Sequence, residues 1–238
     1  MLVEYRKAVK TGFPTDGLMI LVGNPKSGKT TLASAFPDSY VLELERGGAD
    51  RVDGRIDNVS SLADFRKKLK AAVEEKSVGT IVVDTIDVLS DWLELEIAQK
   101  YGLQKMNDSK QGVNGYEKWG DYRDKVETLV DYFKACGKLI VLIAHCKEPK
   151  VLEDQVVTPA GINMPGKAGN YIAAQADLIG YVYKKPVGST THFYVTFSGG
   201  PLGVWGSRIK ELNNKTLQFT ESDPFACFKE VFKPLGGK

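Results

Sequence analysis

Residues 23–30 read GNPKSGKT and fit the pattern G-x-x-x-x-G-K-[ST] at every position. An apolar run, Leu18–Val22, predicts a buried strand before the motif, and a helix is predicted from Lys29. Glycines let backbone N–H groups curl around phosphate oxygens, and the N-terminal end of a helix attracts the same anion. We therefore expect Lys29 to reach the β- and γ-phosphates of a nucleotide and the Thr30 hydroxyl to bind Mg²⁺; the alternative is a glycine-rich surface turn. The residues expected to bind the nucleotide are Gly23, Asn24, Pro25, Lys26, Ser27, Gly28, Lys29, Thr30 and Thr31.

Apolar strand-like runs alternate with helix-like stretches along the chain, which predicts an α/β fold with a mostly parallel central sheet. Further strands are predicted at Tyr40–Leu44, Thr80–Val83 and Leu139–Ala144, and helices at Leu62–Glu75, Ile86–Tyr101, Tyr116–Ala135 and Asn170–Ala176. Two irregular stretches, 102–115 and 147–167, interrupt the pattern and are longer than ordinary connections.

From Asp177 the pattern becomes β-like, which predicts a C-terminal β extension of the sheet. We predict one domain over residues 1–238, with an N-terminal segment 1–16 and a tail 223–238. The letters FACFKEVF in the tail predict a short terminal helix.

The composition limits the classes of function. The chain has 238 residues, with 32 basic and 30 acidic side chains and a formal charge of +2, so only local patches could attract nucleic acid. Three cysteines form no CxxC pattern and there are only two histidines, which argues against a Cys–His metal site. The N-terminus has no apolar core of the signal-peptide kind, and the longest apolar run, Leu139–Ala144, is too short to span a bilayer. These features predict a cytoplasmic protein.

The segment TIVVDT, residues 80–85, is an apolar strand that ends in an acid, Asp84. In nucleoside triphosphatases with a phosphate-binding loop, such an acid belongs to the Mg²⁺ shell. Ligands of open α/β sheets bind at the carboxyl ends of the strands, where Asp84 is placed. The alternative is that Asp84 is the N-cap of the following helix. Asp87 is expected to be only an acid in the first turn of that helix.

Two further polar residues follow predicted strands. Glu45, in VLELERGG, stands beside a Gly-Gly turn and could deprotonate the attacking water, with Glu43 as the second choice. His145 ends LIVLIAH and could report on a bound γ-phosphate. The alternatives are a solvated strand-end acid and a core histidine whose hydrogen bonds are satisfied.

The number and placement of arginines distinguish small-molecule kinases from other nucleotide enzymes. The chain has seven arginines against twenty-five lysines, with no cluster that could form the arginine-lined lid of a small-molecule kinase. Arg208, in WGSRIKEL, could instead act with Lys210 on the nucleotide of a neighbouring subunit, as an arginine finger does. The alternative is an ordinary surface charge.

The ordered set GNPKSGKT, VLELERGG, TIVVDT, LIVLIAH and PGKAGNYIAAQADLIGYVYK resembles the RecA-type ATPase core. It also resembles the short phage-encoded RecA-like proteins described as nucleotide-binding or Sak-type single-strand annealing proteins. The resemblance covers roughly residues 15–220, and its narrower part depends on motif order and on the last segment.

The resemblance implies an ATP- and Mg²⁺-dependent ATPase that binds single-stranded DNA as an oligomer, a ring or a filament, with a single-strand-binding protein as a further partner. It makes Glu45 the catalytic base, Asp84 the Walker-B acid and His145 the γ-phosphate sensor, a position that is commonly Gln in RecA. It places Arg208 and Lys210 near the basic residues that act across the subunit interface.

By the same resemblance, the stretches 102–115 and 147–168 fall where the two DNA-binding loops lie. The lysines that could contact DNA there are Lys105, Lys110, Lys147, Lys150 and Lys167. The second loop is neutral by charge, so we expect modest and salt-sensitive affinity for single strands. Trp119 is expected to be buried, whereas for Tyr116 the sequence does not decide between burial and contact with DNA.

We therefore expect an ATPase of phage DNA recombination that promotes annealing or strand exchange. One alternative is a helicase- or packaging-type DNA motor of the same fold. Another is a non-catalytic nucleotide switch that recruits replication partners.

Overall fold

The computed structural model describes residues 16–152, 155–158, 160–200, 203–229 and 231, with the backbone alone for 150–152 and 155–158. The strands of the large sheet are β1 (Gly17–Gly23), β2 (Ser39–Glu43), β3 (Arg55–Asn58), β4 (Thr80–Asp84), β5 (Leu139–Lys147), β8 (Gly161–Ile162), β9 (Leu178–Val187), β10 (Thr190–Thr196), β11 (Gly206–Ser207) and β12 (Thr216–Phe219). The helices are α1 (Lys29–Ser34), α2 (Leu62–Glu74), α3 (Ile86–Lys100), α4 (Gly115–Ala135), α5 (Ala168–Gln175) and the 3₁₀ helix η1 (Pro224–Phe228).

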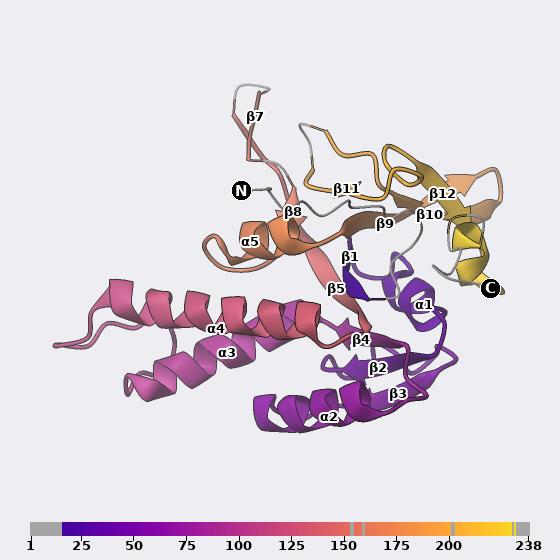
Figure 1. Ribbon diagram of the computed structural model, residues 1–238. Helices are drawn as coiled ribbons and strands as arrows, with labels where there is room; N and C mark the ends of the chain where they lie inside the picture. The colour runs from indigo at the N-terminus through magenta and orange to yellow at the C-terminus, as the bar shows by residue number, and fades with distance from the viewer. Residues whose placement is uncertain (1–15, 153–154, 159, 201–202, 230, 232–238) are drawn as a thin grey trace, which may run out of the picture.

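The main path through the sheet has the strand order β12-β10-β9-β1-β5-β4-β2-β3 (Figure 1). Along this path β9, β1, β5, β4, β2 and β3 run parallel, and β10 and β12 continue the sheet antiparallel. The predicted α/β class, with a mostly parallel sheet and a C-terminal β extension, is confirmed.

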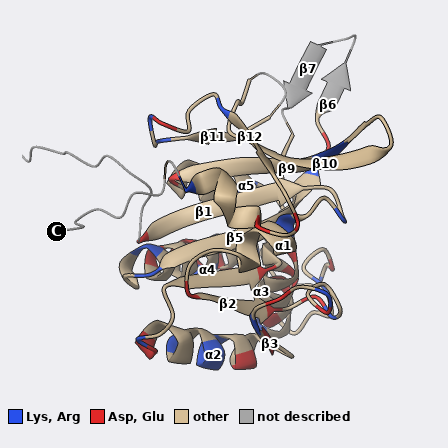
Figure 2. Ribbon diagram, turned by 90° about the vertical axis from the view of Figure 1, so that its right-hand side faces the viewer, with Lys and Arg blue, Asp and Glu red and all other residues tan. Residues whose placement is uncertain are grey.

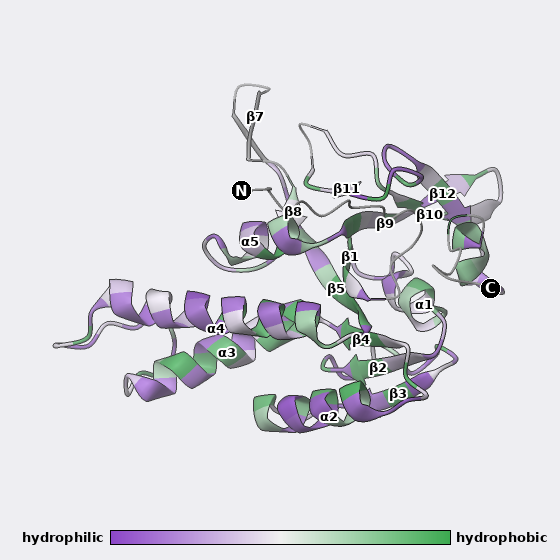
Figure 3. Cartoon of the chain, in the orientation of Figure 1, coloured by the Kyte–Doolittle hydropathy of each residue, from purple (hydrophilic) through white to green (hydrophobic). Residues whose placement is uncertain are grey.

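Alternation along β1 builds a core on each face of the sheet. Leu18, Ile20 and Val22 pack with the apolar sides of α2, α3, α4 and α5 on one face. Met19 and Leu21 pack on the other face with α1 and η1. Figure 3 shows the central strands as hydrophobic, whereas the helices mix both kinds of residue. A strand that is buried on both faces reads as a continuous apolar run, which is why these strands could be predicted.

Two short side-chain caps set where α2 and α4 begin. Ser61 Oγ accepts a hydrogen bond from Asp64 N at 3.2 Å, and Asn114 Oδ1 accepts one from Tyr116 N at 2.9 Å. The second cap ends the stretch 102–115, which joins α3 to α4 at the far tip of a helical hairpin (Figure 1). The irregular connection predicted there is confirmed.

The stretch 147–167 was wrongly predicted to be irregular throughout. Strand β5 continues to Lys147, β8 pairs with its end, and β6 (Lys150–Leu152) pairs with β7 (Gln155–Thr158) in a hairpin. The pairing of Cys146 with Ile162 joins residues distant along the chain, so no local pattern announces it.

Strand β3 was not predicted from the sequence. It is a short edge strand with polar residues, RIDN, and among the described strands it pairs only with β2. Asp57 secures it, because Asp57 accepts hydrogen bonds from Tyr40 Oη at 2.6 Å and from Lys68 Nζ at 2.7 Å. An edge strand buries little apolar surface, so its sequence carries no apolar alternation.

Most of the predicted N-terminal segment 1–16 and the end of the tail lie outside the described residues. The first four residues of FACFKEVF, Phe225–Phe228, belong to the 3₁₀ helix η1, whose Phe228 packs against Phe36 and Phe197. No helix in the described part of the chain is long and apolar enough to cross a membrane.

Charged residues gather on the helices and loops, as Figure 2 shows along α2. Glu96 on α3 accepts hydrogen bonds from both terminal nitrogens of Arg66, at 2.7 and 2.9 Å, and lies 2.9 Å from Lys125 Nζ. The Arg66 hydrogen bonds, with Lys125, hold the pKa of Glu96 at about 2 despite its partial burial.

This depressed pKa predicts a pH-dependent contribution to stability. The stabilisation is present above the pKa of an unfolded glutamate, about 4.3, and is lost as the pH falls toward 2. Because the group is partly exposed, we expect Glu96→Gln to lower the free energy of unfolding at neutral pH by only about 0.5–1 kcal/mol. Urea denaturation at several pH values measures this. The difference from wild type should shrink in acid, and a difference independent of pH would contradict the assignment.

Candidate nucleotide-binding site

The register of the parallel strands brings four predicted site positions to one edge of the sheet. Gly23 of β1 pairs with His145 of β5, and Asp84 of β4 pairs with Glu43 of β2. Gly23, Glu43 and Asp84 end their strands, and His145 lies two residues before the end of β5, so all four lie at the carboxyl edge where open α/β sheets bind ligands.

A hollow of about 480 Å³, here called the nucleotide pocket, opens at this edge. The predicted residues that line it are Pro25, Lys26, Ser27, Gly28, Lys29, Thr30, Thr31, Glu45, Asp84 and His145. Asn24 lines a smaller adjoining hollow, and Gly23 lies beneath the loop, where its carbonyl accepts a hydrogen bond from Lys29.

Two glycines are required by close approach. A Cβ at Gly23 would lie 2.3 Å from the Val182 carbonyl oxygen and 2.8 Å from Ser27 Oγ. Gly28 has a φ of +97°, and a Cβ there would lie 3.0 Å from the Phe193 ring. The loop can therefore keep this path only with glycine at both ends.

Lys29 is buried at the start of α1. Its ammonium group donates hydrogen bonds to the carbonyl oxygens of Gly23 at 3.0 Å and Asn24 at 2.9 Å. Burial lowers its pKa, and the nearby carboxylates of Asp84, Asp87 and Glu45 oppose that shift. The cation thus lies against the inside of the loop, at the place where phosphate oxygens are expected.

Thr30 and Asp84 form the second part of the site. Thr30 Oγ1 donates a hydrogen bond to Asp84 Oδ2 at 2.7 Å, which joins α1 to the end of β4. Burial raises the pKa of Asp84 to about 6, helped by Glu45 and Glu43 and opposed by Thr30 and Lys29. The hydroxyl and the carboxylate are the oxygen donors that Mg²⁺ prefers.

Buried polar atoms also test the fit of a nucleotide and a metal ion. Among the described residues, Ser27 Oγ, Thr85 Oγ1 and Asp87 Oδ1 are buried without a hydrogen-bond partner. Ser27 and Thr85 line the nucleotide pocket. Buried polar groups without partners are costly, and ligand oxygens or water would satisfy these two. The residues present therefore fit a phosphate chain with Mg²⁺ held by Thr30 and Asp84.

The two glutamates after β2 differ in their surroundings. Glu43 is buried, and its Oε1 accepts a hydrogen bond from Ala49 N at 2.7 Å, so it holds the turn that follows. Glu45 is exposed and lines the nucleotide pocket, with its backbone N–H donated to the Asp84 carbonyl at 3.2 Å. Of the two, Glu45 has the carboxylate that can meet water in the pocket.

His145 lines the nucleotide pocket and contacts Asp87. Its backbone N–H donates to Asp87 Oδ2 at 2.9 Å, and its ring Nδ1 lies 3.5 Å from the same oxygen. Burial raises the pKa of the Asp87 carboxyl, and the contacts with His145 oppose this. Asp87, expected only as a first-turn acid, therefore holds the end of β5.

Arg208 lies away from the nucleotide pocket of its own chain. Its guanidinium donates to the Ala174 carbonyl at 2.7 Å and pairs with Asp177 at 3.4 Å. Asp177 also accepts a hydrogen bond from Leu18 N, at the opposite end of β1 from the loop. Lys210 is exposed and does not line the pocket. Action on a neighbouring subunit stays a prediction.

The lysines proposed for DNA are dispersed. Lys105 and Lys110 lie at the tip of the α3–α4 hairpin, Lys147 ends β5, and Lys167 precedes α5. The Lys150 side chain lies outside the described residues. None of the described four lines the nucleotide pocket.

Several residues that line the nucleotide pocket were not predicted. From the β extension these are Lys184 on β9, its register partner Phe193 on β10, and Glu221. The others are Arg46, Gly47, Gly48, Val52 and Thr85. The sequence signal for Lys184 was its position as the first lysine after the mostly apolar strand residues LIGYVY. Its position beside the loop depends on the pairing of β9 with β1, which sequence does not display.

Lys184 and Lys185 provide a matched pair for a binding test. Successive side chains of a strand point to opposite faces, so Lys185 faces away from the pocket. We expect Lys184→Ala to weaken ATP binding about five- to tenfold, through loss of a phosphate-directed charge, with Lys185→Ala near wild type. Calorimetric titration with a non-hydrolysable ATP analogue measures both. Equal effects of the two substitutions would remove Lys184 from the site.

The glycine-rich loop between β1 and α1, the Lys29 and Thr30 side chains and the acid at the end of β4 define a P-loop nucleotide-binding ATPase with a RecA-like α/β fold. A family model described as an AAA domain matches residues 17–214, and the chain belongs to that family.

Among solved structures, the crystal structure of the KaiC-like protein PH0186 from the hyperthermophilic archaeon Pyrococcus horikoshii OT3 is similar. The two are 16% identical, the match covers 88% of this chain and 87% of that chain, and the TM-score is 0.51. This similarity supports the fold. No curated protein matches the chain.

Proposed function

We propose that this protein is an ATP- and Mg²⁺-dependent ATPase that binds single-stranded DNA and acts in phage DNA recombination, as an oligomer in the host cytoplasm. The observation that carries the ATPase part is the contact of Thr30 with Asp84 beside the buried Lys29. The motif order and the segment PGKAGNYIAAQADLIGYVYK support the recombination part.

The proposed hydrolysis is an in-line attack of water on the γ-phosphorus. A P–O bond to water forms as the bond to the ADP oxygen breaks, and the Glu45 carboxylate accepts the proton of the water. Lys29 exchanges its contacts with the loop carbonyls for phosphate oxygens and offsets the charge that develops there. Thr30 and Asp84 are the residues that would hold Mg²⁺, and the ion would neutralise negative charge on the phosphates.

His145 is proposed to report on the γ-phosphate. It lies between the nucleotide pocket and the segment that returns through β8, because the His145 carbonyl accepts a hydrogen bond from Asn163 N at 3.1 Å. A change at His145 therefore has a direct structural path to residues 161–168.

Substitutions of Glu45 and Glu43 distinguish a catalytic glutamate from a structural one. We expect Glu45→Gln to lower ATP turnover about 100- to 10,000-fold with ATP binding retained, because the amide cannot accept the proton. Glu43→Gln keeps an oxygen acceptor for Ala49 N and should retain most activity. Steady-state turnover and nucleotide binding are measured for both. A large loss in Glu43→Gln alone would transfer the proposed role to Glu43.

Turnover with and without single-stranded DNA tests the whole proposal. We expect single strands to stimulate hydrolysis severalfold, and Lys29→Ala to abolish both basal and stimulated turnover. Lys185→Ala is the matched lysine control outside the pocket. Full turnover in Lys29→Ala would overturn the ATPase site. Turnover indifferent to DNA would overturn the DNA-dependent part and favour the nucleotide switch or a motor with another partner.

A further inference from the structure

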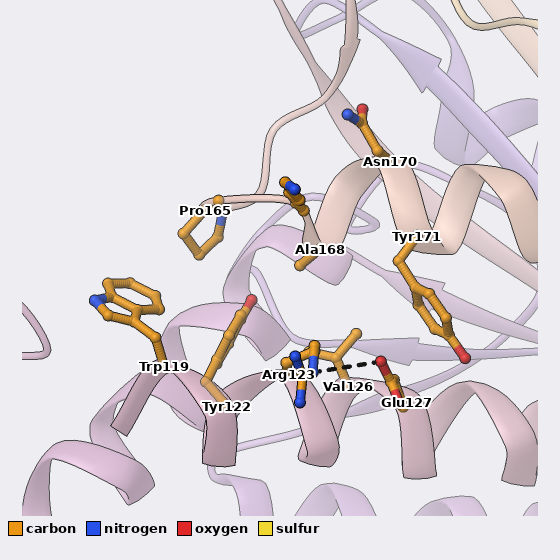
Figure 4. Close-up of a pocket in the computed structure, with 11 residues that line it drawn as sticks. Trp119, Tyr122, Arg123, Val126, Glu127, Pro165, Ala168, Asn170 and Tyr171 are labelled. Carbon is orange, nitrogen blue, oxygen red and sulfur yellow. Dashed lines mark ion pairs between the residues drawn. The ribbon is translucent and has the colours of Figure 1, made fainter. Parts of the chain in front are cut away.

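A groove runs between the first half of α4 and the segment that leads into α5. Trp119, Tyr122 and Val126 line it from α4, and Pro165, Ala168 and Tyr171 line it from the other side (Figure 4). Trp119, which was expected to be buried, is only half-buried. Its volume is about 570 Å³, which is in the range of ligand-binding clefts. It is separate from the nucleotide pocket, with which it shares no lining residue.

The groove continues toward the tip of the α3–α4 hairpin. A second hollow of about 690 Å³ shares Trp119, Arg123 and Lys167 with the first, and Tyr116 also lines it. The Tyr116 side chain is 92% exposed, and no described residue covers its ring. We call the two hollows together the aromatic groove.

The charges along the aromatic groove favour an anionic occupant. Arg123 and Lys167 line it, against one acid, Glu127. Lys167 is exposed and forms no ion pair within the described part of the chain. Arg123 contacts Asp124 at 3.2 Å and Glu127 at 3.6 Å, and all three side chains are exposed enough to rearrange at little cost.

A comparable hollow on the other side of α4 is about 500 Å³ in volume, and its cations are Arg66, Lys70 and Lys125. Each of them already has an acid partner: Glu96 pairs with Arg66 and Lys125, and Glu74 lies 3.9 Å from Lys70. Tyr132, 40% exposed, also lines that hollow and provides a matched tyrosine on the same helix.

We propose that the aromatic groove binds single-stranded nucleic acid, with bases stacked on Tyr116 and Trp119 and phosphates contacted by Arg123 and Lys167. The inference rests on the proposed function and assigns its DNA contacts chiefly to this groove rather than to the loop lysines. Base stacking on aromatic rings tolerates any sequence and supplies affinity that does not come from charge. It therefore suits a chain whose formal charge is only +2.

The groove is also structurally connected to the nucleotide pocket. Asn163 N donates to the His145 carbonyl, and Pro165 and Ala168 follow within the same short segment. One wall of the groove is thus held by the end of β5, at which the nucleotide pocket is built. Nucleotide-dependent binding in the groove has a continuous set of contacts through which to act.

Binding of a fluorescein-labelled oligothymidylate of about 20 nucleotides tests the inference. Fluorescence anisotropy, with ATP analogue present, should show a five- to fiftyfold weaker affinity for Tyr116→Ala and near-wild-type affinity for Tyr132→Ala. Arg123→Gln should weaken binding and reduce the salt slope by about one, whereas Lys125→Gln should not. Tyr116 is almost fully exposed, so its removal should not unfold the protein, and unchanged basal ATP turnover checks this.

Tryptophan fluorescence gives a second measurement. It would not change on addition of the oligonucleotide if Trp119 had only a structural role. Stacking should quench Trp119 when the oligonucleotide binds. Trp119→Phe should remove this change, whereas Trp92→Phe, on α3 and outside the lining of the groove, should retain it. Wild-type binding that survives the Tyr116 and Arg123 substitutions unchanged would overturn the groove and leave the proposed function standing. A wild-type protein that binds no single strand would overturn both the DNA part of the function and this inference.

Discussion

The hydrogen bond between Thr30 and Asp84 joins the phosphate-binding loop to the neighbouring end of β4, and the rest of the site is arranged around it. It is possible because β1, β5 and β4 run parallel in one register, so that their carboxyl ends share an edge. The same register places His145 beside Gly23. A shift of one residue in any of these pairings would turn the polar ends away from the nucleotide pocket.

Burial of charge at this edge has an energetic consequence. Lys29 and Asp84 are both buried, and burial shifts their pKa values toward the neutral forms. Such groups stabilise a fold poorly, because each loses its hydration. A bound nucleotide and metal ion would supply the missing partners, and ligand that binds only the folded state adds to its stability. The site is thus built for binding rather than for the stability of the empty protein.

The end of β5 connects two surfaces of the molecule. His145 reaches the nucleotide pocket, while Asp87 holds its backbone and Asn163 donates to its carbonyl. Beyond Asn163 the chain forms one wall of the aromatic groove. Strand β9, which follows α5, returns beside β1 and brings Lys184 to the nucleotide pocket. Segments that are far apart in sequence therefore respond to the same few contacts.

The amino-acid sequence by itself was enough to predict the loop 23–30, the fold class and the central strands. A tight phosphate loop demands glycines at fixed positions, and doubly buried strands demand unbroken apolar runs. Only the tertiary structure decided the separate surroundings of Glu43 and Glu45, the contact of Asp87 with His145, and the placement of Lys184 and the aromatic groove. Strand β3 and the pairing of β8 with β5 were equally hidden. These features depend on strand register and on contacts between segments that are distant along the chain. The free energy of such contacts comes from pairing across the fold, so they leave no periodic pattern in the local sequence.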